Sequence, residues 1–144
     1  MKTILSILIA TMLLGSPALA DTNSDSMLDL TNQARTSRSI AALTVNDRVA
    51  RYAYNHSITM AQGGTLVHTN NLGKKLTRWG IKWTTAGENI GRTTGTLAYL
   101  QQAFMDSPGH RANILNPQFK NVGIGVYVDS KGEYWVTLDR KSVV

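Results

Sequence analysis

The feature that most constrains the fold is a change of hydrophobic period along the chain. Near the C-terminal end, four apolar residues alternate with small or polar ones: Val122, Ile124, Val126 and Val128. This period of two predicts a strand, residues 129–132 (DSKG) have turn-forming composition, and residues 134–138 predict a returning strand. Earlier segments repeat their apolar residues at helical spacing instead. Helices followed by an antiparallel hairpin predict the α+β class, with helices packed on a small sheet.

The helical segments have recognisable ends. We predict helices over residues 25–37, 47–62, 72–80, 96–105 and 107–115. Asn46 suits an N-cap, and Gly63 with Gly64 ends the second segment. In the run DSPGHRANIL, Ser107 is expected to cap a helix through its side-chain oxygen, with Pro108 at the first helical position. We predict a loop over residues 65–71 and a short extended piece over 86–91.

The first twenty residues have the composition of an export signal. Lys2 precedes an apolar run, and Ala18-Leu19-Ala20 ends it with small residues, so we predict a signal peptide over residues 1–20. The alternative is a membrane anchor, but the run is shorter than the ~20 residues that a bilayer requires. Residues 21–26 are expected to form a polar tether, and residues 27–144 one domain. The mature protein is expected to be secreted, to the periplasm or beyond.

Composition excludes several classes of site. The chain has no cysteine, which excludes disulfides, thiolate metal sites and a lipid anchor on cysteine. Without Lys2, 14 basic and 9 acidic side chains remain, a net charge of +5. These basic residues are scattered apart from one local cluster, Lys74, Lys75, Arg78 and Lys82. A nucleic-acid partner is therefore not expected, and a solvated face with weak attraction to anionic envelope polymers is favoured.

The three histidines have different surroundings. His56 lies on the apolar stripe of its helix and is expected to be a core residue with a hydrogen-bonded ring. His68 lies in a loop, where side chains can be directed into a cleft. His110 is expected in the first turn of a helix, where the dipole favours the neutral imidazole that binds metals or accepts protons.

Glu88, in the run AGENI, is flanked by small and apolar residues and is expected to be partly buried. A structural acceptor and a chemical role are equally supported by the residues alone. The separations of His68, Glu88 and His110 do not form a local metal motif.

The runs LVHT, AGENI and FMDSPGHRANILNPQFKNVGIGVYVD resemble the bacterial, SCP-like branch of the CAP superfamily, which includes cysteine-rich secretory proteins, antigen-five (allergen V5/Tpx-1-like) venom allergens and group-one plant pathogenesis-related proteins. The resemblance covers about residues 27–138. It implies a three-layer α-β-α sandwich with a central antiparallel sheet. It also implies a cleft with two histidines and two acids, in which some members bind zinc or another divalent ion.

By position, His68 and His110 match the family's two histidines, and Glu88 matches the glutamate of its GEN motif. The second acid is expected shortly after His68, where this chain has Asn70 and Asn71 instead. The resemblance therefore implies a site with one carboxylate.

Three functions remain open at this point. The first is an exported protein that binds a divalent metal, zinc foremost, or a small or envelope-derived ligand, with His68 and His110 as metal ligands. The second is a metal-dependent hydrolase of peptides or envelope polymers, with Glu88 as the general base. The third is a structural envelope domain with an inactive cleft. Because one acid is missing, we favour binding over hydrolysis; the residues leave open the oligomeric state.

Overall fold

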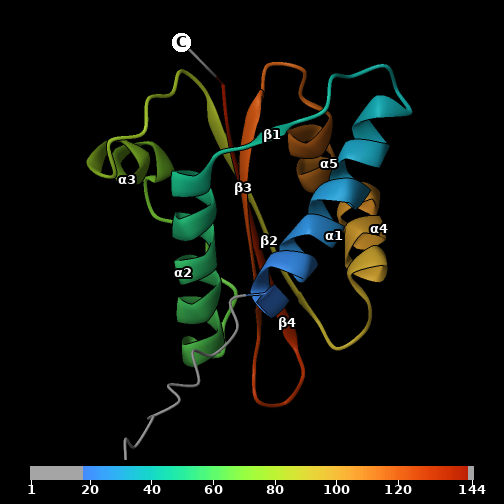
Figure 1. Ribbon diagram of the computed structural model, residues 1–144, viewed down its shortest axis with the longest axis vertical. Helices are drawn as coiled ribbons and strands as arrows, with labels where there is room; N and C mark the ends of the chain where they lie inside the picture. The colour runs from blue at the N-terminus through green and yellow to red at the C-terminus, as the bar shows by residue number, and fades with distance from the viewer. Residues whose placement is uncertain (1–17, 143–144) are drawn as a thin grey trace, which may run out of the picture.

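The structure is a computed structural model that describes residues 18–142, with side chains from residue 22 onward. Its elements follow the chain in this order: α1 (Ala18–Thr36), β1 (Thr44–Val45), α2 (Asp47–Gly63), α3 (Leu72–Arg78), β2 (Ala86–Thr93), α4 (Leu97–Asp106), α5 (Pro108–Leu115), β3 (Asn121–Val128) and β4 (Tyr134–Lys141). Helices lie on both sides of one sheet, with α2 and α3 on one side and α1, α4 and α5 on the other (Figure 1). The predicted α+β class and the three-layer sandwich are confirmed.

The sheet has the strand order β1-β3-β4-β2, so β2 and β1 are its edges. The predicted hairpin is formed by β3 and β4, and β2 pairs antiparallel with β4. The exception is β1, which pairs parallel with β3 through Thr44 and Val45. Two residues are too short a segment to show an alternating pattern, so no local signal predicts this strand.

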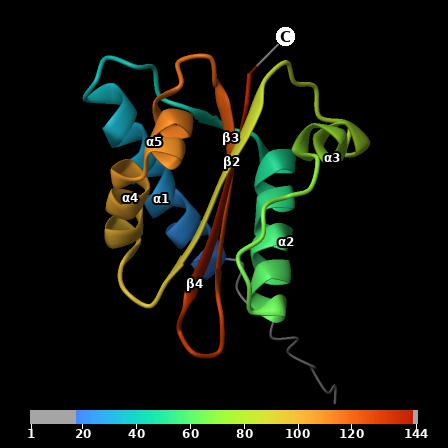
Figure 2. The same cartoon turned by 180° about the vertical axis from the view of Figure 1, so that it is seen from behind.

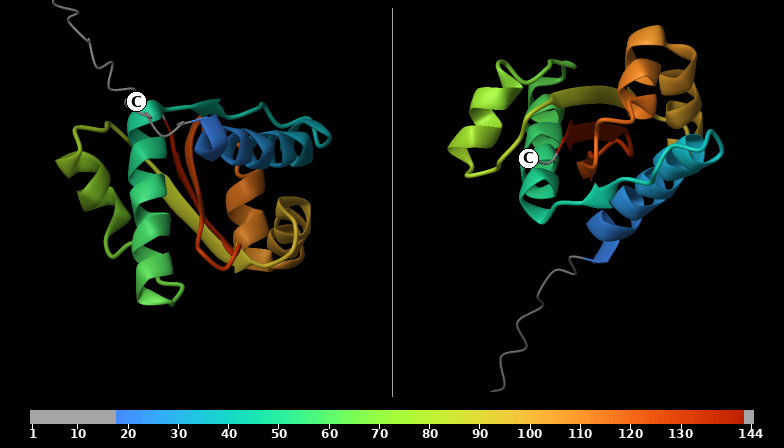
Figure 3. Two further views of the ribbon diagram at one scale, coloured as in Figure 1. Left: turned by 60° about the horizontal axis from the view of Figure 1, so that its bottom comes forward. Right: turned by 90° about the horizontal axis from the view of Figure 1, so that it is seen from above.

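Helix α2 lies directly on β3 because two glycines leave room for its backbone. A Cβ atom at Gly123 would lie 2.1 Å from the Val49 carbonyl carbon, and one at Gly125 would lie 2.1 Å from the Tyr54 amide nitrogen. These are distances at which no side chain fits. The opposite face of the sheet packs against α1, α4 and α5 through the main hydrophobic core. Figure 3 shows these three helices together on that side of the sheet. The buried members of this core include Met27, Leu100, Phe104, Ile114, Val122, Val136 and Leu138.

The predicted helix ends are confirmed for α2, where the Asn46 side chain accepts from the Val49 amide and Gly64 adopts a left-handed conformation. Two expectations were wrong. Ser107 occupies the N-cap position of α5, but its side chain makes no capping bond. Helix α1 begins at Ala18 rather than near residue 25, so residues 21–26 are helical and do not form a tether. The predicted signal peptide lies mostly outside the described residues, and its cleavage site remains a prediction.

Candidate functional site

A histidine and a carboxylate form the centre of the candidate site. The His68 ring donates its Nδ1 hydrogen to Oε1 of Glu88 at 2.8 Å, and the Thr69 amide donates to the same oxygen at 2.8 Å. The His68 side chain is 62% exposed and the Glu88 side chain only 5% exposed. The imidazole is therefore exposed to solvent while it is hydrogen-bonded to a buried carboxylate. Its Nε2 atom remains available to a ligand.

Helix α2 holds the loop that carries His68. The His56 ring bonds through Nε2 to the Val67 carbonyl at 2.8 Å, and the Tyr52 hydroxyl donates to Oγ1 of Thr69 at 3.1 Å. His56 and Tyr52 lie one turn apart, and their rings are parallel, with centroids 6.5 Å apart. The residues on both sides of His68 are thus bonded to one rigid helix. The expected hydrogen-bonded ring of His56 is confirmed, although the residue is half-buried rather than in the core.

A second acid lies beside Glu88, and this corrects the expectation of a single carboxylate. Asp139 of β4 is the register partner of Glu88 on β2 and is fully buried. Burial and then the negative charge of Glu88 raise the pKa of Asp139 well above its usual range. Burial also acts to raise the pKa of Glu88, but hydrogen bonds from Thr69, His68 and Asp139 outweigh it and leave this pKa below its ordinary value.

The other carboxyl oxygens of Glu88 and Asp139 indicate that one of the two acids carries a proton. Oε2 of Glu88 and both carboxyl oxygens of Asp139 are buried and have no donor among the described protein groups when both acids are ionised. Two carboxylates cannot bond without a hydrogen between them, so one proton between the acids joins Oε2 of Glu88 to one oxygen of Asp139. The directions of the two pKa shifts assign that proton to Asp139.

His110 is held on the other side of the edge strand. It lies half-buried in the first turn of α5, with Nδ1 3.0 Å from Oγ of Ser107 and its ring 4.9 Å from the Phe104 ring. Ser107 thus contacts the histidine rather than capping the helix. Burial first, and then the charges of His68 and Arg140, lower the pKa of His110. The predicted neutral imidazole agrees with this direction, with burial as the main cause.

Two successive residues of β2 connect the two halves of the site. Glu88 binds His68, while Asn89 donates to the His110 carbonyl oxygen at 3.1 Å. Successive side chains of a strand point to opposite faces, so this edge strand holds one histidine segment on each face (Figure 2). Asn113 of α5 completes the connection by donating to the Glu88 carbonyl and to Oδ1 of Asn89.

The donor set suits a cation only in part. Both histidines have Nδ1 next to a protein oxygen, which is the arrangement that orients Nε2 toward a metal. Among residues 22–142, however, no group of three or more His, Cys, Asp or Glu side chains is arranged to hold a metal ion. The protein can thus offer two imidazoles, and water or another ligand would have to supply the other bonds.

Sequence reasoning missed Asp139, Asn89 and Asn113. Asp139 lies 51 positions after Glu88, and only the strand register brings them together. The sequence contains a signal for Asn89, because this residue directly follows Glu88 in the AGENI motif. The asparagines after His68 play other parts, since Asn71 caps α3 through a bond from the Lys74 amide and Asn70 is exposed.

Two bacterial proteins are similar to this chain in sequence or in fold. The protein YkwD of Bacillus subtilis, described as uncharacterized, is 32% identical over 124 residues, which cover 83% of this chain and 48% of that protein. An extracellular protein of Bacillus anthracis that contains an SCP domain has a crystal structure with a TM-score of 0.77 and 29% identity, covering 89% of this chain and 44% of that one. The chain spans about half the length of these two relatives.

A more distant likeness supports the fold. An outer surface protein of Borrelia burgdorferi has a TM-score of 0.79 at 13% identity, covering 85% of this chain and 94% of that one. Within the described part of this chain, no helix is both long enough and apolar enough to cross a membrane. A sequence profile described as "CAP: Cysteine-rich secretory protein family" matches residues 28–139. The chain therefore belongs to the CAP family, in its bacterial branch.

Proposed function

We propose that this protein is an exported binding protein whose edge-strand site takes a divalent cation, zinc foremost, between Nε2 of His68 and Nε2 of His110. The remaining positions on the cation are filled by water or by a small or envelope-derived ligand. The observation that carries the proposal is the shared arrangement of the two rings. Each has Nδ1 against a protein oxygen, which leaves Nε2 as the free atom.

Protonation supports the same assignment. A metal binds the neutral imidazole, and the lowered pKa of His110 keeps its ring neutral near pH 7. The hydrogen bond to Glu88 fixes the Nδ1–H tautomer of His68, which leaves the lone pair of Nε2 for a metal. A hydroxyl oxygen accepts hydrogen bonds, so Ser107 can hold the same tautomer of His110.

Glu88 is an orienting residue in this proposal. One of its oxygens receives two hydrogen bonds, and the other faces Asp139 inside the protein. The hydrolase alternative requires Glu88 to take a proton from water, and neither oxygen is directed to solvent. Binding is therefore favoured over hydrolysis. Two protein ligands also predict weaker metal affinity than the three or four of typical zinc sites.

Zinc affinity in competition with a chromophoric chelator tests the proposal. His68→Ala and His110→Ala should each lower the affinity by at least about tenfold, and Glu88→Gln by roughly 10–100-fold, as loss of a supporting carboxylate does elsewhere. His56→Gln is the matched control, because it removes an imidazole but keeps an N–H donor for the Val67 carbonyl. If zinc binds equally well to the wild type and to a His68→Ala/His110→Ala double variant, the proposed site is wrong.

The hydrolase alternative has a separate test. Wild type and Glu88→Gln are incubated with peptidoglycan and with casein, with and without zinc. Activity in the wild type that disappears in Glu88→Gln, at an unchanged melting temperature, would favour the enzyme. Absence of turnover together with zinc binding supports the binding protein.

A further inference from the structure

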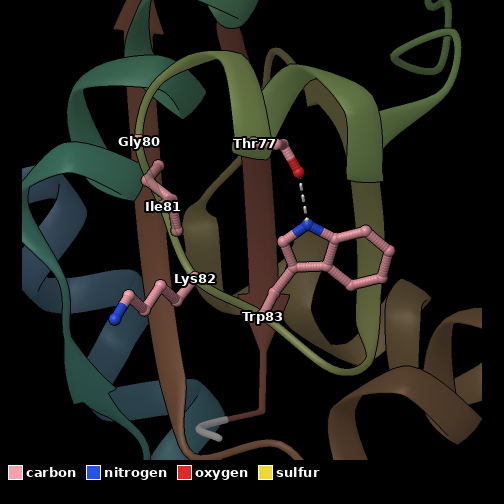
Figure 4. A pocket seen from close by; sticks show the side chains of 5 residues that line it. All are labelled: Thr77, Gly80, Ile81, Lys82 and Trp83. Atoms are coloured by element: carbon pink, nitrogen blue, oxygen red, sulfur yellow. Dashed lines mark hydrogen bonds between the residues drawn. The ribbon is translucent and has the colours of Figure 1, made fainter.

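A second surface, formed by α3 and the segment after it, has features of a binding site. A pocket of about 420 Å³ is lined by Thr77, Gly80, Ile81, Lys82 and Trp83. Figure 4 shows the indole of Trp83 turned back under α3 toward Thr77, while the side chain of Lys82 extends away from it on the other side. The pocket is therefore bounded by an aromatic ring at one end and has a cation at the other.

The Trp83 ring is fixed in place. Its Nε1–H donates to Oγ1 of Thr77 at 3.1 Å, and a Cβ atom at Gly73 would lie 2.4 Å from the ring. The ring thus packs directly against Gly73. A residue with a side chain at this position would collide with the ring. Trp83 is half-buried, and its polar edge is already satisfied. Because the ring is held before any ligand arrives, little side-chain entropy is lost when it stacks.

Exposed cations without carboxylate partners lie on α3 and on the segment that carries this ring. Lys74 and Arg78 lie one turn apart on α3, on the stripe next to the one that carries Gly73 and Thr77. They are exposed, as are Lys75 and Lys82, and none of the four forms an ion pair within residues 22–142. Residues 72–87 contain no Asp or Glu. Uncompensated positive charge beside a pocket favours an anionic ligand.

We propose that this surface, Lys74, Arg78, Lys82 and Trp83, binds an anionic polysaccharide. A sugar ring has an apolar face of C–H groups that can stack on an indole, and its acidic groups can pair with lysine and arginine. The pocket is open, and the exposed cations are spread along α3, at Lys74 and Arg78, and along the segment after it, at Lys82. Such a layout suits a chain that crosses the pocket rather than a single small anion held at one point.

Two other polyanions fit less well. A membrane surface would be expected to meet exposed apolar side chains beside the cations. The large hydrophobic residues that are exposed in the described chain, Val45, Leu66, Val67, Tyr99 and Val128, all lie outside α3 and the segment that follows it. Single-stranded nucleic acid uses several stacking platforms in succession. Trp79, the other tryptophan here, packs edge-to-face on Tyr52 instead.

The test measures binding of the purified protein to polygalacturonate by titration calorimetry at low salt. Lys74→Gln/Arg78→Gln should lower the affinity on the order of tenfold, as two cations beside a polyanionic surface contribute. Arg38→Gln/Lys131→Gln removes the same charge from exposed positions after α1, which lies across the sheet from α3, and in the β3–β4 turn, and it should have little effect. Trp83→Phe, which keeps an aromatic ring at this position, should remove most of the ligand-induced change in tryptophan fluorescence.

The outcomes separate this proposal from its alternatives. Equal losses in the two double variants would mean attraction by net charge alone and would overturn it. Tighter binding to phosphatidylglycerol vesicles or to a DNA oligonucleotide than to polygalacturonate would also overturn it. Neutral dextran should bind weakly. The His68→Ala/His110→Ala variant should keep polygalacturonate binding. The proposal for this surface is therefore tested independently of the proposal for the histidine site.

Discussion

Glu88 and Asp139 stand directly opposite each other on neighbouring strands, with their carboxyl groups on the same buried face of the sheet. One proton between them allows both acids to be buried, and it leaves Glu88 charged toward His68. An exposed histidine is thus hydrogen-bonded to a carboxylate that lies beside a second, buried acid.

Asp139→Asn should make the protein less sensitive to alkaline pH. The folded chain holds a proton on Asp139 that the unfolded chain releases near pH 4, because the folded pKa is raised. Its stabilising contribution is complete below about pH 4 and is lost as the pH rises through the folded pKa. Asparagine supplies a permanent donor to Glu88, so urea unfolding from pH 4 to 9 should show a smaller decline than in the wild type.

The matched control for that variant is Asp139→Leu. Leucine cannot donate, so Oε2 of Glu88 loses the donor that Asp139 supplies, and the free energy of unfolding at pH 7 should fall by about 1–3 kcal/mol. Equal stability of the asparagine and leucine variants would show that no hydrogen bond joins the two acids.

Arg35→Met should strongly destabilise the fold. The guanidinium of Arg35 is fully buried and donates to four backbone carbonyls, those of Ala41, Ile114, Asn116 and Phe119. These bonds join the end of α1 to the segment after α5. Methionine removes all four bonds, and of these carbonyls the one of Asn116 keeps a bond from the Phe119 amide. We expect a loss of at least about 3 kcal/mol by urea unfolding. A change below about 1 kcal/mol, the worth of a single ordinary hydrogen bond, would contradict this role.

Arg140→Met should have the opposite effect. Arg140 is also fully buried, but none of its guanidinium nitrogens has a hydrogen-bond acceptor among the described residues. Burial lowers its pKa to about 9, so at neutral pH it is charged at a cost in stability. Replacing such a charge with an apolar side chain should raise stability by about 1–4 kcal/mol at pH 7. Because this cost is relieved as the pH rises above about 9, the stability advantage of the methionine variant should shrink there. A melting temperature of the variant below that of the wild type at pH 7 would show that Arg140 has a stabilising partner.

Gly123→Ala and Gly125→Ala should each displace α2. The added methyl group would lie within 2.1 Å of helix backbone atoms, which cannot move alone. We expect a loss of about 3 kcal/mol or more, above the usual cost of overpacking because backbone is involved. Gly109→Ala is the control, since nothing lies within 4 Å of the added atom. The melting temperatures of the three variants test this prediction. Equal values for all three would contradict the close approach of α2 to β3.

Local patterns in the sequence predict most of this fold. Asn46, Gly64 and the alternating residues of β3 act within a few positions of themselves, and the elements they predict are present. The same reasoning placed a cap on Ser107 that the structure does not have. The hydroxyl of Ser107 can bond to a helix amide or to the His110 ring, and the sequence does not reveal which partner it takes.

The candidate site was less predictable because strand register assembles it. His68, Glu88 and His110 were identified from the residues and the family resemblance, but Asp139 enters only through its pairing with Glu88. The resemblance predicts the second acid close to His68 along the chain, whereas Asp139 lies across the sheet. Likewise, no local pattern distinguishes Arg35, with four acceptors, from Arg140, with none among the described residues.

The most direct test of the histidine site is side-chain nitrogen-15 NMR during a zinc titration at pH 7. The chain has three histidines, so each ring can be assigned with single variants. We predict that the Nε2 signals of His68 and His110 shift together and saturate at one zinc per chain, while His56 stays unchanged. Movement of only one of the two rings, or of neither, would contradict a shared cation between them.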